Sequence, residues 1–287
     1  MTRAWNPDEP TKRAAIVAVL DQTGLAGAEL LEATPIGIRQ VDNATSNDGR
    51  RPDRGMGNGY YYIIVDASDA SDAIDTLDRI RPIAANHNLY PIITAERDGI
   101  WLPHFADDPA ANLDASESMK ALDDAAAHCD PRWRLDEKET SGPLIERDWP
   151  NQIPYSRESY EIRDARLTSD PPRVALRFLP GRDAISAVSH IDYRGDSPPT
   201  PRILANLRRW NERYGLDLIS ASNCSIEIRV GRFPADRTEA LKTARECYLL
   251  CPSIGGEYDD ILGFECDDIH KLAAHLMGSA YWLFWWS

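Results

Sequence analysis

The sequence has few of the features that mark a membrane or secreted protein. No stretch approaches the roughly 18 consecutive apolar residues that a membrane helix needs, and the mean hydropathy is -0.45. The first twenty residues carry charges ahead of a short apolar run and show no small-residue cleavage site. The five cysteines are an odd number, which argues against a disulfide framework. We therefore expect a cytoplasmic protein that does not span a membrane and keeps its thiols reduced.

Positive charge is also scarce, mainly in the first half of the chain. Residues 1–150 hold 15 Lys and Arg against 27 Asp and Glu, a net charge of -12, whereas residues 151–287 hold 17 against 19, a net of -2. An acidic surface repels phosphate backbones, so we expect no direct binding to nucleic acid. It attracts basic proteins, so a basic protein partner is one interpretation of this charge and solubility alone is the other.

At 287 residues the chain is long enough for two domains that each bury a core. Residues 60–65 and 89–94 are rich in aromatic and β-branched side chains and predict strands, and residues 67–86 between them predict a helix. Proline and charge dominate residues 132–172. We predict an acidic N-terminal α/β lobe at 1–130, a linker or arm at 131–172, and a C-terminal α/β domain at 173–287.

The C-terminal domain is expected to alternate strands and helices. A strand at 174–179 precedes a helix at 202–214 that stops at Gly215, and further helices are expected at 236–250 and 267–279. The order of elements resembles that of the first lobe, which suggests two related lobes. The predicted class is α/β or α+β, with each lobe a mixed β-sheet flanked by helices.

Five aromatic side chains lie within residues 281–286, although the chain as a whole is only 8% aromatic. A chain end is ordinarily prone to fray, and large aromatic side chains become ordered there when they are inserted into a core. We therefore predict that this segment is a strand that completes the C-terminal lobe.

Four segments of the C-terminal half carry a resemblance to a known family. They are Leu207–Gly215, Ala244–Pro252, Leu272–Leu276 and the closing Trp282-x-Phe284-Trp285-Trp286. Over roughly the last 110 residues the chain resembles the bacterial domain of unknown function 4253. That family usually closes with Asp, whereas this chain has Ser287, so the terminal motif lacks its charged group. The resemblance implies no activity, because the family is uncharacterised.

Three cysteines and a histidine near the C-terminus have spacing that suits a metal. Cys247 and Cys251 are four residues apart, and so are Cys266 and His270. Residues four apart share a helical face, and three thiolates with one imidazole can hold structural zinc. Cysteine is also among the residues most often buried, so ordinary buried thiols are the alternative. No other cofactor is expected.

Two further groups of residues are candidates for binding a ligand or a partner. Arg208, Arg209 and Arg213 make the helix at 202–214 cationic, and Trp210 stands among them. In the first lobe Asp69 and Asp72 belong to a series of aspartates at every third residue. A three-residue step falls about 60° short of a full turn, so these carboxylates spread around a helix and favour a solvated face over a cation site.

The leading functional hypothesis is a non-enzymatic protein-binding module whose acidic half engages a basic partner, as an immunity-type inhibitor of a toxin does. One alternative is an enzyme that acts on a small ligand between the lobes, with the arginines of helix 202–214 and the region from Cys247 to His275 around it. Another alternative is a subunit of a larger assembly, in which the arm would contact neighbouring subunits.

Overall fold

A computed structural model describes the chain as two compact units. One unit comprises residues 1–102 and 161–183, and the other comprises 103–160 and 184–287. Within them the structure describes residues 9–25, 28, 30–33, 60–66, 70–95, 104–105, 149–150, 155, 157–168, 170–193, 197–222, 224–251, 254 and 268–286.

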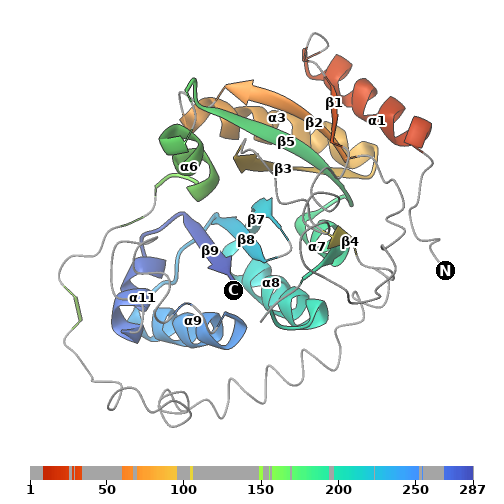
Figure 1. Ribbon diagram of the computed structural model, residues 1–287. Helices are drawn as coiled ribbons and strands as arrows, with labels where there is room; N and C mark the ends of the chain where they lie inside the picture. Colours follow the sequence, from red (N-terminus) through yellow and green to blue (C-terminus); the bar gives the residue numbers. More distant parts are fainter. Residues whose placement is uncertain are drawn as a thin grey trace, which may run out of the picture. The chain divides into compact units, whose positions relative to one another are not determined.

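The first unit is built on a four-stranded sheet (Figure 1). Its neighbouring strands are antiparallel. Helix α3 connects β2 to β3, and β5 lies between these two strands, which makes a split β-α-β unit. The elements are β1 (Leu31–Ala33), β2 (Tyr60–Asp66), α3 (Ala70–Asn86), β3 (Leu89–Ala95) and β5 (Arg173–Pro180).

Helix α3 has one buried face and one exposed face. Ala73, Leu77, Ile80 and Ala84 follow helical spacing and are fully buried. The helix gives way to β3 at Asn88, whose φ of 58° lies in the left-handed region that asparagine tolerates. Helical periodicity followed by a turn residue thus produces the predicted helix and the strand that follows it.

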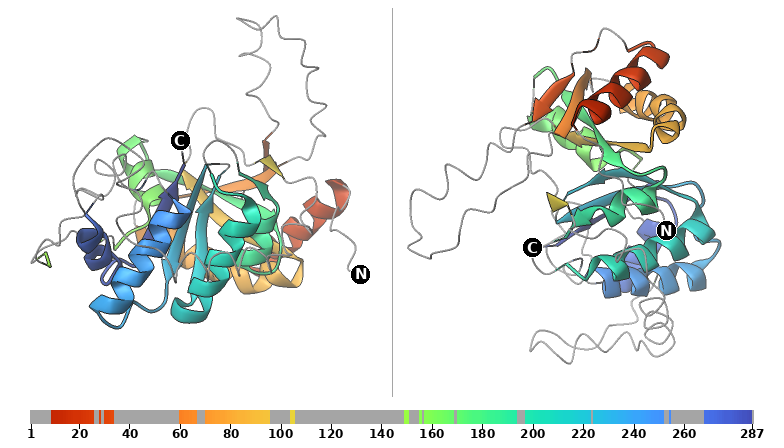
Figure 2. Two further views of the ribbon diagram at one scale, coloured as in Figure 1. Left: turned by 90° about the horizontal axis from the view of Figure 1, so that it is seen from below. Right: turned by 90° about the vertical axis from the view of Figure 1, so that its right-hand side faces the viewer.

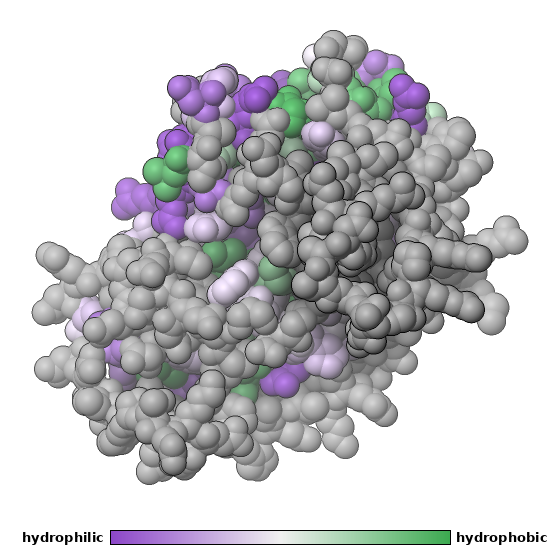
Figure 3. Space-filling view, in the orientation of Figure 1, coloured by the Kyte–Doolittle hydropathy of each residue, from purple (hydrophilic) through white to green (hydrophobic). Residues whose placement is uncertain are grey.

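Two further helices belong to or border the first unit. Helix α1 (Glu9–Gln22) packs beside α3, and Figure 2 shows the two together on one side of the sheet. Helix α6 (Tyr160–Thr168) precedes β5 and buries Ile162 and Ala165. On the face that Figure 3 presents, hydrophilic areas of the first unit are interspersed with small hydrophobic ones.

The second unit contains an antiparallel sheet in the order β7-β8-β9, with α8, α9 and α11 on one face (Figures 1 and 2). A short ladder of β4 and β6 and the small helix α7 complete its described part. The elements are β4 (His104–Phe105), α7 (Ala184–Ser189), β6 (Ile191–Asp192), α8 (Thr200–Tyr214), β7 (Leu216–Ala221), β8 (Ser225–Val230), α9 (Arg237–Leu250), α11 (Ile269–Leu276) and β9 (Tyr281–Trp285).

The core of the second unit is aromatic. The Trp210 ring of α8 stacks on Phe284 with ring centroids 5.2 Å apart, and it meets Trp282 edge-on at 6.0 Å. Side chains alternate along β9, so Trp282 and Phe284 face the helices while Leu283 points to the other face. The indole of Trp282 donates to the Ser279 carbonyl at 3.0 Å, so burial leaves its N–H paired.

Several expectations about the second unit are confirmed. The fold combines helices and sheets as predicted, and because the described neighbouring strands are antiparallel, it is the α+β form of the predicted class. The aromatic end is the strand β9, which pairs with β8 from Tyr281 to Trp285. Helix α8 stops at Gly215, whose φ of 66° suits glycine and whose N–H donates to the Asn211 carbonyl at 2.9 Å.

The strand β5 lies elsewhere than expected. The strand predicted at 174–179 was expected to begin the C-terminal domain, but β5 pairs with β2 and β3 in the first unit. The idea of a repeated strand-helix-strand lobe is therefore wrong, because its second copy would need β5 beside β7. The segment 131–172 was expected to be a linker or arm, and its described part contains helix α6. Strand pairing between distant segments decided this assignment, and local periodicity carries no signal for it.

Among the residues that the structure describes, no helix combines the length and the apolar character needed to cross a membrane.

Candidate functional site

The polar centre of the second unit is the buried carboxylate of Glu246 on α9, with 2% of its surface exposed. Its Oε2 accepts a hydrogen bond from Trp210 Nε1 at 2.8 Å and another from Arg213 Nη2. Arg209 Nη1 lies 3.5 Å from Oε1. All three donors come from α8. A buried carboxylate is costly unless it is paired in this way, so Glu246 joins α8 to α9.

A second polar group lies one turn away, around the hydroxyl of Tyr214. It lies 2.6 Å from the Thr243 hydroxyl and donates to Glu239 Oε1 at 3.1 Å. Desolvation by burial is the main reason that the pKa of Tyr214 rises to about 12, and the charge of Glu239 acts in the same direction. The phenol is therefore protonated at neutral pH and acts as a donor.

The first turn of α9 is held by a reciprocal cap. Asp236 Oδ1 accepts the Glu239 N–H at 2.9 Å, and Glu239 Oε2 accepts the Ala235 N–H at 2.8 Å. This is a close variant of the capping box, in which an acid at the third helical position reaches back toward the start of the helix. Both oxygens of Glu239 are thereby used, one by this cap and one by Tyr214.

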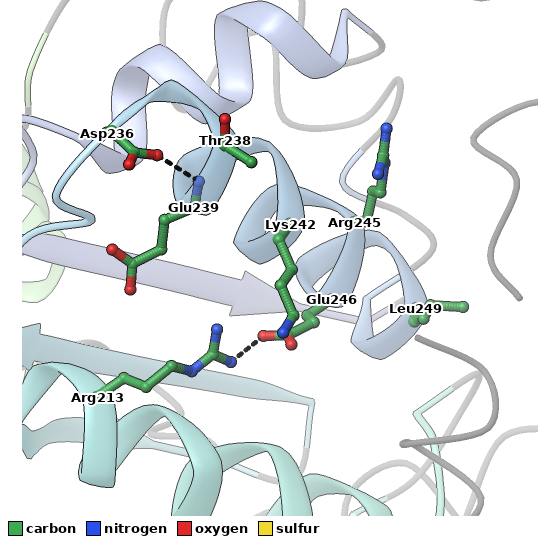
Figure 4. A pocket seen from close by; sticks show the side chains of 8 residues that line it. All are labelled: Arg213, Asp236, Thr238, Glu239, Lys242, Arg245, Glu246 and Leu249. Atoms are coloured by element: carbon green, nitrogen blue, oxygen red, sulfur yellow. Dashed lines mark hydrogen bonds and ion pairs between the residues drawn. The ribbon is translucent and has the colours of Figure 1, made fainter. Parts of the chain in front are cut away.

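A cavity of about 480 Å³ opens beside these groups. Figure 4 shows that α9 supplies most of its wall and that α8 supplies Arg213. Lys242 extends toward the side of Arg213, whereas Arg245 extends away from it. The volume falls in the usual range of small-molecule pockets, roughly 300–1,000 Å³. The lining residues are Arg213, Asp236, Thr238, Glu239, Lys242, Arg245, Glu246 and Leu249.

The structure brings together three of the four residues predicted on the cationic helix. Arg209, Arg213 and Trp210 converge on Glu246, and Arg213 also lines the cavity. Arg208 is half-buried on α8 and does not line this cavity. Because Arg209 and Arg213 already serve an internal carboxylate, their charge is largely committed within the second unit. Their predicted role in binding a partner or ligand stays a prediction.

The predicted acidic residues lie in the first unit. Asp72 is exposed in the first turn of α3, and Asp69 lies outside the described residues. Asp75 and Asp78 are also exposed, on the side of the helix away from its buried face. Asp78 lies 3.6 Å from Arg81, whose guanidinium sits 5.0 Å from the centre of the Tyr90 ring. The row is a solvated face of α3, as the spacing predicts.

The predicted zinc ligands are described only in part. Cys247 and Cys251 are fully buried, and the Cys251 thiol donates to the Trp285 carbonyl at 3.0 Å. Burial raises the pKa of Cys247 well above its usual value, which disfavours the thiolate that zinc or a nucleophile requires. His270 lies in the first turn of α11 and meets the Trp149 ring edge-on. Cys266 is outside the described residues, so the zinc set stays a prediction.

Glu246 and Glu239, the two carboxylates that organise this site, are not among the residues predicted from the sequence. Glu246 precedes Cys247 and lies between Thr243 and Leu250 on a side of the helix that is otherwise buried. A carboxylate among buried positions needs a cationic partner, and the arginines of helix 202–214 were the available ones. This pattern was readable in the sequence, although the pairing of the two helices was not.

A known protein family matches the C-terminal part of the chain. Residues 175–287 match the family model described as a domain of unknown function, DUF4253, so this part of the chain belongs to that family. The matched residues begin inside β5 and include the cavity, the Glu246 cluster and the aromatic strand β9. No curated protein and no solved structure gives a significant match.

Proposed function

We propose that the chain is a cytoplasmic, non-enzymatic protein-binding module whose acidic first unit engages a basic partner protein. An inhibitor of the immunity type is the specific form of this proposal. The observation that carries it is the exposed face of α3. Asp72 and Asp75 are exposed there and have no hydrogen bond or ion pair with any residue that the structure describes. Unneutralised carboxylates on a helix surface steer a cationic partner toward it.

The state of the polar groups in the second unit supports binding rather than catalysis. Glu246 and Glu239 each use both carboxylate oxygens within the fold. His275 is buried, and its Nδ1 lies 3.1 Å from the Ser279 hydroxyl. Groups committed in this way hold the fold together, and a general acid or base needs an atom that reaches the substrate. None of the three described cysteines forms a disulfide, which is consistent with the cytoplasmic setting proposed here.

The test is affinity capture by the immobilised full chain from a lysate of the organism that carries this gene, at low and at high salt. We expect a basic protein whose capture falls as salt rises, because surface charges are screened over about 8–10 Å at physiological ionic strength. Titration of that purified protein should then show binding about fivefold weaker to the Asp72→Asn/Asp75→Asn variant, since each exposed charge contributes modestly.

The matched control is the Asp21→Asn/Glu212→Gln variant, which removes the same number of charges from exposed positions on α1 and α8. It should bind like the wild type if the face of α3 is the binding surface. Equal weakening in both variants would show that only net charge matters. The proposal would be overturned if the amount of captured protein did not change with salt and both double variants bound like the wild type.

A further inference from the structure

The acidic side chains that line the cavity on α9 have more hydrogen-bond and ion-pair partners within the fold than the basic ones do. Three acidic and three basic side chains line it, so its formal charge is balanced. The acidic ones are bound within the fold. Glu246 accepts from α8, Glu239 accepts from Tyr214 and from the Ala235 N–H, and Asp236 caps the helix. Arg209, which does not line the cavity, also pairs with Glu246.

Two of the three basic side chains that line the cavity, Lys242 and Arg245, have few interactions within the described part of the fold. Lys242 and Arg245 form no hydrogen bond or ion pair with the residues that the structure describes. The Nε atoms of Arg245 and Arg213 are buried and have no hydrogen-bond partner there. Buried N–H donors are nearly always paired in folded proteins, and an unpaired one calls for a ligand or solvent. The wall thus offers cationic donors that an anion would satisfy.

The volume and the lining residues of the cavity indicate which class of anion it would bind. A cavity of about 480 Å³ is far larger than the roughly 30 Å³ that one water molecule occupies in the liquid. Thr238 and Leu249 also line it, so the wall includes a neutral polar residue and an apolar one. Arginine and lysine together bind oxyanions, because the guanidinium offers paired N–H groups and the ammonium offers a compact charge.

We propose that this cavity is a binding site for a small organic oxyanion, a molecule that bears a phosphate or carboxylate group, with Lys242 and Arg245 as its cationic contacts. Arg213 also lines the cavity and pairs with Glu246, and its buried Nε has no hydrogen-bond partner among the described residues. The site is separate from the acidic face of α3, so it does not depend on the proposed protein partner. The proposal assigns a class of small ligand to a domain of unknown function.

The experiment uses the full wild-type chain and two probes, inorganic phosphate and citrate, titrated by calorimetry at constant ionic strength with chloride as the balancing anion. We expect saturable binding of at least one probe with one site per chain. Binding of phosphate alone would assign a phosphate ligand, binding of citrate alone a carboxylate ligand, and binding of both the shared oxyanion chemistry. Each of these results supports the site, and no saturable binding of either probe at about 10 mM would overturn it.

A charge-matched pair of variants locates the binding. Lys242→Gln/Arg245→Gln should weaken it about tenfold or more, since it removes both proposed contacts. Arg79→Gln/Arg232→Gln removes two exposed cations elsewhere and should leave the affinity unchanged. Equal loss in both variants would mean that the anion follows the overall charge, and it would overturn the assignment. Amide chemical shifts that move on α9 during the wild-type titration give a second measurement that needs no variant.

Discussion

The indole N–H of Trp210 donates a hydrogen bond to Oε2 of Glu246 at 2.8 Å, and both side chains are buried. The same tryptophan ring stacks on Phe284 of β9. One residue of α8 therefore joins the carboxylate of α9 to the aromatic strand at the end of the chain. The polar cluster and the aromatic core of the second unit share this contact, so we expect a change in either to affect the other.

Removal of the charge on Glu246 should destabilise the second unit. Glu246→Gln keeps an acceptor for Trp210 but leaves Arg213 and Arg209 facing a neutral group, and both arginine side chains are largely buried. We expect a loss of about 2–3 kcal/mol in the free energy of unfolding, measured by urea denaturation, because the hydrogen bonds lose their charged acceptor. Glu212→Gln changes an exposed acid on α8 and should cost less than about 0.5 kcal/mol. Similar losses in the two variants would refute the importance of the buried pairing.

The terminal strand should be essential to the core. Trp282→Ala removes a buried ring that meets both Trp210 and Tyr214, and we expect a loss of about 3–5 kcal/mol. The control is Leu283→Ala, which alters the next residue on the opposite, half-buried face of β9 and should cost less than half as much. Thermal unfolding followed by near-ultraviolet circular dichroism measures both, and a larger effect at Leu283 would contradict the packing.

Tyr214 should make stability depend on pH in the alkaline range. Its pKa is about 12 in the fold against an ordinary value of 10.0, so the folded state holds the phenolic proton more tightly than the unfolded chain does. Its contribution is fully present below pH 10 and is lost as the pH rises toward 12. We expect the melting temperature of Tyr214→Phe to fall less than that of the wild type between pH 10 and 12. Parallel curves for the two proteins would show that Tyr214 does not titrate in this window.

The three described cysteines should differ in reactivity. Cys224 is half-buried, whereas Cys247 and Cys251 are fully buried and burial raises the pKa of Cys247. Because the thiolate is the reactive form, a maleimide should label Cys224 in the native protein and should label the other two only after unfolding. Peptide mapping by mass spectrometry checks this. Native labelling of Cys247 as fast as that of Cys224 would show that α9 opens readily or that this thiol is ionised.

Zinc analysis of the same preparations bears on the predicted metal set. If Cys247, Cys251, Cys266 and His270 hold zinc, the purified protein should contain one zinc per chain and Cys251→Ser should lose it. Chelation should then expose the thiols to the maleimide. Protein free of zinc whose buried thiols remain protected would instead favour ordinary buried cysteines.

The sequence by itself determined the local elements. The aromatic and β-branched run at 60–65 gave a strand, helical spacing gave the buried face of α3, and Gly215 ended α8, because each depends on neighbours within a few residues. The five aromatic residues within 281–286 predicted a buried strand, because side chains of that size become ordered when they pack in a core. The motif resemblance also led to the correct family for residues 175–287.

Only the tertiary structure decided which elements meet. It placed β5 between β2 and β3 rather than beside β7, and it paired Arg209 and Arg213 of α8 with Glu246 of α9. Both outcomes arise between segments more than 30 residues apart. Their free energy comes from strand pairing, burial and desolvation at contacts that close a long loop, and no periodicity within a single segment records those contacts.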